Sequence, residues 1–142
     1  MPFAEVSITK NLVTKEEKSI IAQKLTKILL DSEGLIDNPI SRSIALLDIR
    51  EFDCLYVGGQ NGNCDKVVIK IHMFSDVVSK EIKKRLFKDI TDVFISVSNK
   101  VKAQNGRNVW CIINSLHDFD FGAGGVPITL EDTRNLVSSY GK

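Results

Sequence analysis

The stretch KVVIKIHMF, residues 66–74, decides the fold, because strongly β-forming residues here open the second half of the chain. The sequence after it predicts a helix over residues 78–99, since apolar side chains recur there at helical spacing. An Asn-Gly pair at positions 105–106 marks a turn, and VWCIIN, residues 109–114, predicts another strand. The second half of the chain is therefore predicted to have the order strand, helix, strand.

The first half of the chain has the same order of elements. Residues 3–9 alternate apolar and polar side chains, as a half-buried strand does. TKEE, residues 14–17, is a capping box that opens a helix, and the order of acidic before basic residues suits the helix dipole. Gly34 and Pro39 predict a loop, and SIALLDI, residues 43–49, predicts a second, largely buried strand.

We expect residues 1–142 to form a single α+β domain from two consecutive β-α-β units, 2–57 and 66–128, followed by the segment 129–142. A helical crossover joins two parallel strands with right-handed geometry. Two such units side by side predict a four-stranded mixed sheet with two helices on one face. The other face carries many apolar residues, which predicts burial against other subunits.

Composition excludes several classes of protein. Of 142 residues, 43% are hydrophobic and 26% are charged, which is typical of an ordinary globular domain. The net charge of +1 gives no argument for nucleic acid or a membrane surface as partner. No apolar run reaches the length of a membrane span, and the start MPFAEVSITK does not resemble a signal peptide. These features predict a cytoplasmic protein.

Cysteine and histidine give no sign of a disulfide framework or a metal site. The three cysteines are an odd number without a C-x-x-C pair, and the two histidines, His72 and His117, lie far apart in sequence. We therefore expect neither a metal nor another cofactor.

Pro2 is the leading candidate for a catalytic residue. Removal of Met1, which a small second residue favours, would make Pro2 the chain terminus and turn its nitrogen into a secondary amine. An α-amino group titrates near neutral pH, and burial lowers the pKa of a cationic group further. A terminal proline in a dry pocket would be a neutral base at physiological pH. The alternative is that Pro2 is an ordinary residue at the start of the chain.

The tail WCIINSLHDFDFGAGGVPI, residues 110–128, joins the fourth strand to a glycine-rich loop. Together with Pro2, the two units and the stretch DCLYVGGQNGNCDKVVIKIHMF, residues 53–74, it resembles the tautomerase superfamily, which includes 4-oxalocrotonate tautomerase, cis-3-chloroacrylic acid dehalogenase and macrophage migration inhibitory factor. The resemblance implies a homotrimer whose sheets close into a barrel, with pockets near subunit boundaries. It also implies that Pro2 acts as general base or acid in keto–enol tautomerisation of a small 2-keto acid.

The resemblance further implies four substrate-binding residues, each with a plainer alternative. Arg42 matches an arginine that would hold the substrate carboxylate, or it is a solvated arginine at a strand edge. Phe74 and Trp110 fall near pocket-wall positions, or they are ordinary core aromatics. Asp120 corresponds to a carboxylate that activates water in the dehalogenase, or it is a surface loop residue.

The sequence departs from the family where cations are expected. The stretch IHMFSDVVSK, residues 71–80, has no arginine, and none occurs between Arg50 and Arg85. Dehalogenation is therefore not expected. Two other functions stay open: a trimeric ligand-binding or interaction protein that has lost the chemistry, and a related hydratase or decarboxylase that uses Asp120.

Overall fold

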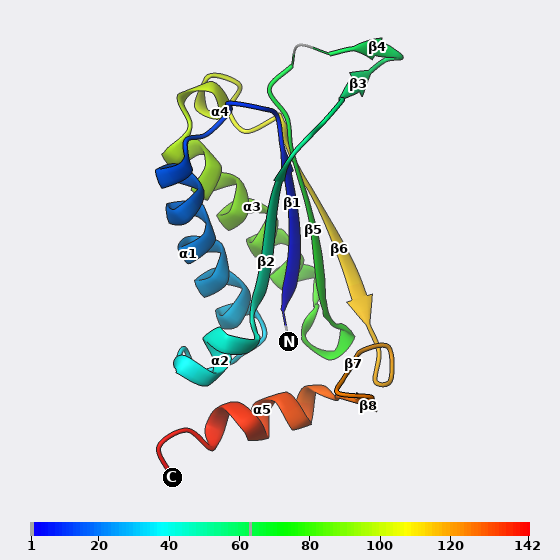
Figure 1. Ribbon diagram of the computed structural model, residues 1–142. Helices are drawn as coiled ribbons and strands as arrows, with labels where there is room; N and C mark the ends of the chain where they lie inside the picture. Colours follow the sequence, from blue (N-terminus) through cyan, green and yellow to red (C-terminus); the bar gives the residue numbers. More distant parts are fainter. Residues whose placement is uncertain (1, 63) are drawn as a thin grey trace.

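A computed structural model describes residues 2–62 and 64–142 of the chain (Figure 1). The elements follow in the order β1 (Phe3–Ile8), α1 (Lys15–Ser32), α2 (Pro39–Ile44), β2 (Leu46–Glu51), β3 (Tyr56–Val57), β4 (Gln60–Asn61), β5 (Val67–Phe74), the 3-10 turn η1 (Ser75–Val77), α3 (Lys80–Val97), α4 (Asn99–Ala103), β6 (Val109–Leu116), β7 (Gly122–Ala123), β8 (Val126–Pro127) and α5 (Leu130–Ser138). Among these residues, no helix has both the length and the hydropathy that crossing a membrane requires.

The main sheet has four strands in the order β2-β1-β5-β6. β1 is parallel to β2 and β5 is parallel to β6, while the two central strands, β1 and β5, are antiparallel to each other. This is the mixed sheet that two consecutive β-α-β units predict. In its register Phe3 lies beside both Leu46 and His72, so the amino end of β1 meets the carboxyl end of β5.

One face of the sheet packs against α1 and α3, which lie on the same side of it (Figure 1). Ala4, Val6 and Ile8 of β1 point into this core, and each is 1% exposed. The period-two alternation of a strand places their neighbours Phe3, Glu5 and Ser7 on the opposite, outer face. The predicted arrangement of two helices on one face is therefore confirmed.

Side-chain caps set where the long helices begin. The predicted capping box at the start of α1 is present: the Glu17 backbone N–H donates to Thr14, and the Thr14 backbone N–H donates to Glu17. The second long helix begins at Lys80, two residues later than predicted, because Ser79 is its cap.

The predicted loop and strand around residues 39–49 are partly wrong. Asn38 accepts a hydrogen bond from Ser41, and Pro39 occupies the first helical position, so residues 39–44 form α2 and β2 begins only at Leu46. The predicted match between charge order and the dipole of the first helix holds only at its amino end, where Glu16 and Glu17 lie in the first turn. The last turn of α1 has no basic residue, and the acidic side chain of Glu33 lies at its C-cap.

The segment 129–142 contains a helix, α5, that crosses the end of the sheet where β1 begins (Figure 1). Leu130, Thr133 and Val137 are its buried side chains. The Asn38 side-chain amide donates to the Val137 carbonyl at 2.9 Å, which ties α5 to the start of α2. The last helix therefore forms one wall around the amino end of the central strand.

Candidate active site

Pro2 lies at the amino end of β1, between two neighbouring strands, and is buried. Its carbonyl accepts a hydrogen bond from the Leu46 backbone N–H at 3.1 Å. The antiparallel register pairs Phe3 with His72, so one further step places Pro2 opposite Met73. Strand β1 thus places Pro2 between the start of β2 and the end of β5. Met1, whose removal would free the proline nitrogen, lies outside the described residues.

Glu33, the C-cap residue of α1, also lies beside this turn of chain. Glu33 is 0% exposed, which is rare for a carboxyl group. Burial raises the pKa of this carboxyl, while a hydrogen bond from the Phe74 backbone and the charge of Arg134 act in the opposite direction. Phe74 directly follows Met73, the residue opposite Pro2, so Glu33 and Pro2 approach the same turn of chain.

A polar cleft opens beside Glu33. Its volume is about 320 Å³. The lining residues come from the ends of α1, η1, α3 and α5: Asp31, Ser32, Glu33, Gly34, Asp76, Val77, Ser79, Ile82, Arg85 and Arg134. The guanidinium of Arg134 lies close to the Gly34 backbone, where an added Cβ would be 3.9 Å from it.

A second cleft of about 470 Å³ adjoins the first. The two clefts share Asp76 and Arg134, and the second continues along α5 past Thr129, Leu130 and Glu131. Arg134 therefore lies at the boundary between the two clefts. Among residues 2–62 and 64–142, it and Arg85 are the guanidinium groups that line these two clefts.

Two of the predicted substrate-binding residues lie at this end of the sheet. Phe74 ends β5 and is 2% exposed, so it is a core aromatic that also borders the site. Asp120 follows the end of β6 and is exposed; it accepts a hydrogen bond from the His117 backbone N–H at 2.8 Å. One oxygen of Asp120 is thus used to hold a turn, as in a surface loop.

Arg42 lies on α2, not at the edge of a strand. Its guanidinium donates two hydrogen bonds to Asp37, at 2.6 and 2.8 Å. The hydrogen bond from Arg42 lowers the pKa of the Asp37 carboxyl. A fork of this kind occupies two of the donors that would otherwise bind a carboxylate substrate.

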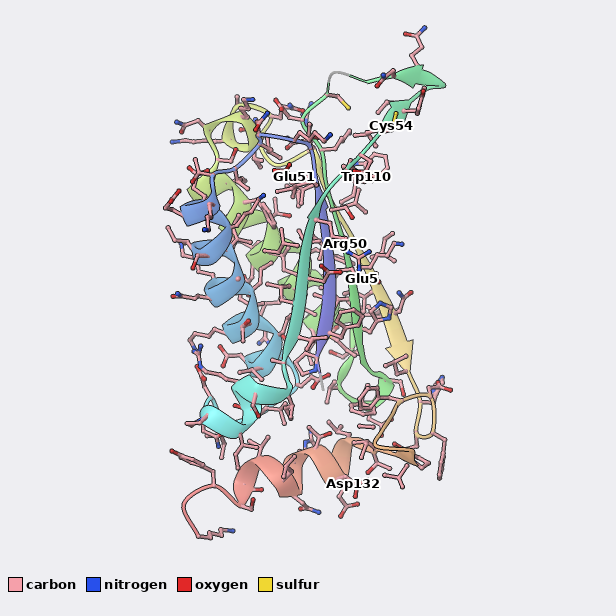
Figure 2. All side chains as sticks on the ribbon, in the orientation of Figure 1. Glu5, Arg50, Glu51, Cys54, Trp110 and Asp132 are labelled. Atoms are coloured by element: carbon pink, nitrogen blue, oxygen red, sulfur yellow. The ribbon has the colours of Figure 1, made fainter. Side chains whose placement is uncertain are left out.

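Trp110 lies at the opposite end of the sheet. Its register partner is Val68, which pairs in turn with Ser7, five residues after Pro2. Along the strand this corresponds to roughly 16 Å. Trp110 is 57% exposed, stacks under the Lys66 ammonium at 4.6 Å and lies near the β3–β4 hairpin (Figure 2). Within one chain, it is therefore separate from Pro2.

Similar structures support the fold of the chain. No protein-family model and no curated sequence matches it. A fused 4-OT in its symmetric trimer superposes with a TM-score of 0.69 at 14% identity, covering 92% of this chain and 97% of the other. A macrophage migration inhibitory factor-like protein from Entamoeba histolytica gives 0.67 at 19% identity, covering 89% and 98%. The FG41 malonate semialdehyde decarboxylase inhibited by 3-bromopropiolate gives 0.63 at 18% identity, covering 87% and 91%.

The chain therefore shares the fold of these solved structures, which is the fold that its sequence resemblance implies. At these identities the similarity extends to the fold alone.

Sequence analysis missed Glu33, Arg85 and Arg134. Each comes from a different helix, so no local motif joins them. One signal was present for Glu33: an acidic residue next to Gly34, which ends the helix, opposes the helix dipole and so calls for another explanation. For the two arginines the sequence holds no comparable signal, because only the packed fold brings Arg85 of α3 and Arg134 of α5 to one cleft.

Proposed function

We propose that this protein is a tautomerase in which Pro2, freed by removal of Met1, moves a proton between oxygen and carbon of a small 2-keto acid. One observation carries the proposal: Pro2 is buried at the amino end of the central strand, beside the end of β5. Glu33, which interacts with the Phe74 backbone there, lines a cleft together with Arg85 and Arg134. Burial favours a neutral amine, and a general base works best when its pKa is near the working pH.

The chemistry divides between the amine and the cations. Neutral Pro2 takes the proton from the enol hydroxyl or from carbon, and the resulting ammonium returns it to the other position. A guanidinium holds the substrate carboxylate and stabilises the charge that develops on the enolate. Phe74 supplies an apolar wall near Pro2, and Asp120 lies at the rim of the same end of the sheet.

Replacing Pro2 by alanine is expected to lower the rate of ketonisation of an aryl-pyruvate enol roughly ten- to hundredfold. The variant keeps a primary amine at the chain terminus but loses the fixed ring that aims the nitrogen. The measurement is the initial rate by ultraviolet absorbance, after mass spectrometry has established that both proteins begin at residue 2. Equal rates in the two proteins would leave a ligand-binding or interaction protein as the better explanation.

Arg134, one of the two cleft arginines, and Arg42, which the sequence predicts, are compared as partners of the substrate carboxylate. Arg134 is favoured because it lines both clefts, whereas Arg42 is already hydrogen-bonded to Asp37. We expect Arg134→Ala to raise KM roughly ten- to hundredfold, because this factor corresponds to the free energy of one charge-assisted hydrogen bond. Arg42→Ala is the matched control, with an expected change in KM below about twofold. The reverse order of effects would assign the carboxylate to Arg42.

We further propose that the active form is a homotrimer. Trp110 lies at the far end of the sheet from Pro2, so it reaches a pocket at Pro2 only as part of a neighbouring subunit. In support, the outer face of the sheet exposes Trp110, Ile112 and Leu46, and one structural neighbour is a symmetric trimer. Each pocket would then combine the Pro2 of one chain with the Trp110 of the next.

A hydratase or decarboxylase on the same fold is the second candidate, because the malonate semialdehyde decarboxylase is a structural neighbour. In that reaction Asp120 would handle water or a β-keto acid. The hydrogen bond from His117 to Asp120 favours a structural role for this carboxylate, so the tautomerase remains the leading proposal.

A further inference from the structure

We propose that Glu33 shares a proton with the amine of Pro2 and so sets the pH range over which Pro2 is a base. The inference rests on the proposed function only in taking Pro2 as the chain terminus. In the pair the proton lies either on the proline nitrogen, opposite an ionised Glu33, or on the Glu33 carboxyl, opposite a neutral proline. Glu33 acts through Pro2 and is a positioning residue.

The position of Glu33 is the first argument. Its carboxyl interacts with the backbone of Phe74, and the register of β1 against β5 places Pro2 opposite the preceding residue, Met73. The C-cap of α1 and the amino end of β1 therefore both lie beside the end of β5. Figure 1 shows the amino end of β1 beside the loop that follows β5.

Burial is the second argument. Glu33 is 0% exposed, and a carboxylate removed from water is costly unless a cation or a hydrogen-bond donor stabilises it. Desolvation accordingly raises the pKa of this carboxyl. A secondary ammonium at Pro2 would supply a cation next to it, and the pair would titrate as one unit.

Charged groups from three other elements also line this cleft. Arg134 from α5 and Arg85 from α3 line the cleft and are exposed. Asp76 from η1 and Asp31 from α1 line it too, and both are exposed carboxylates of the same sign as Glu33. Asp31 is paired with Lys27 at 3.0 Å. Glu33 is thus the buried titratable side chain lining this cleft among the described residues.

The consequence for Pro2 has a definite sign. An ionised carboxylate within a few ångströms favours the protonated form of an amine, typically raising its pKa by about 1–3. Burial alone would lower the pKa of the amine. Glu33 opposes that effect, so the neutral form of Pro2 should appear at higher pH in the wild type than in a variant without this carboxylate.

The test is an NMR titration of protein labelled with ¹⁵N-proline and processed to begin at Pro2. We expect Glu33→Gln to lower the pKa of the Pro2 amine by about 1–3. The near-isosteric amide keeps a group that can contact Phe74, so a merely structural role would leave this pKa unchanged. Asp31→Asn removes an exposed carboxylate from the same cleft and is the matched control, with an expected change below about 0.3.

Activity gives a second, separable readout. If Pro2 is the base, the alkaline-rising limb of the kcat/KM profile should move to lower pH in Glu33→Gln by the same amount as the amine pKa. A shifted amine pKa without ketonisation activity would support the role of Glu33 and contradict the tautomerase. An unchanged amine pKa in a folded Glu33→Gln protein, as judged by its circular dichroism, would overturn the inference.

Discussion

Protein that keeps one residue in front of Pro2 is expected to lose about 10²- to 10⁴-fold in the rate of enol ketonisation, the contribution of a positioned general base. Inside a chain the proline nitrogen is part of an amide and can neither accept nor donate a proton. The blocked protein keeps every side chain of the site. Its loss of rate would therefore measure the amine alone.

The experiment compares two preparations of the same chain. One begins at Pro2, released from an amino-terminal fusion by a protease that leaves no extra residue, and the other retains Met1. Intact mass separates the two, and the rate of ketonisation of an aryl-pyruvate enol is measured on both. A Met1-retaining protein as fast as the processed one would exclude Pro2 as the base, whatever the effect of Pro2→Ala.

This comparison complements the alanine variant. Pro2→Ala preserves an amine at the terminus and changes its shape, whereas retention of Met1 removes the amine and keeps the ring. A large loss in the blocked protein with a small loss in Pro2→Ala would mean that basicity matters more than the rigid ring. Large losses in both would mean that the orientation of the nitrogen also contributes.

The parts of the fold that sequence predicts best are those governed by local interactions. The capping box at Thr14 is satisfied within three residues, so the start of α1 follows from sequence. The alternation in β1 likewise fixes which of its side chains enter the core. The parallel pairing within each half of the sheet follows from two repeated units and the geometry of parallel crossovers. The pairing of β1 with β5, which joins the two halves, is not part of the prediction.

Prediction failed where two local signals competed. Residues 43–49 are apolar enough to form a strand, yet Asn38 and Pro39 start a helix that includes the first of them. The capping hydrogen bonds between Asn38 and Ser41 favour the helix over the strand for residues 39–44. The same shift moved Arg42 from a predicted strand edge onto α2, where Asp37 binds it.

The site is harder to predict than the fold, because its parts are distant in sequence. Pro2 is recognisable from position alone, since only a chain terminus gives proline a basic nitrogen. Glu33 at the end of α1 and Arg134 in the middle of α5 are about a hundred residues apart, and they line one cleft only because α5 crosses the end of the sheet. Burial of Glu33 is likewise a property of the packed chain that hydropathy does not show.

The outer face of the sheet is the surface through which we propose that the subunits of the trimer associate. Ile112 on β6 is 46% exposed beside Lys70 of β5, and the Glu5–His72 pair at 3.1 Å lies on the same face. Figure 2 shows Glu5 and Arg50 near the middle of this surface. Apolar side chains interspersed with charged and polar groups suit an interface in which these groups find partners across subunits.

Ile112→Lys is expected to convert the proposed trimer to monomers. The new ammonium would lie beside Lys70, and burying two like charges at each of the symmetric interfaces costs several kcal/mol per pair. In a single chain the same position is open to water, so the fold should be retained. Phe87→Lys is the matched control, because Phe87 is 41% exposed on α3, in the helix layer.

Light scattering coupled to size exclusion gives the mass of each variant, and the ketonisation assay gives its activity. We expect Ile112→Lys to have the mass of one chain and to lose most of its activity, since Trp110 of a neighbouring subunit would no longer reach the Pro2 pocket. Phe87→Lys should keep both properties of the wild type. A monomeric Ile112→Lys protein with full activity would place the whole site within one chain, and a trimeric one would show that this face of the sheet is not the interface.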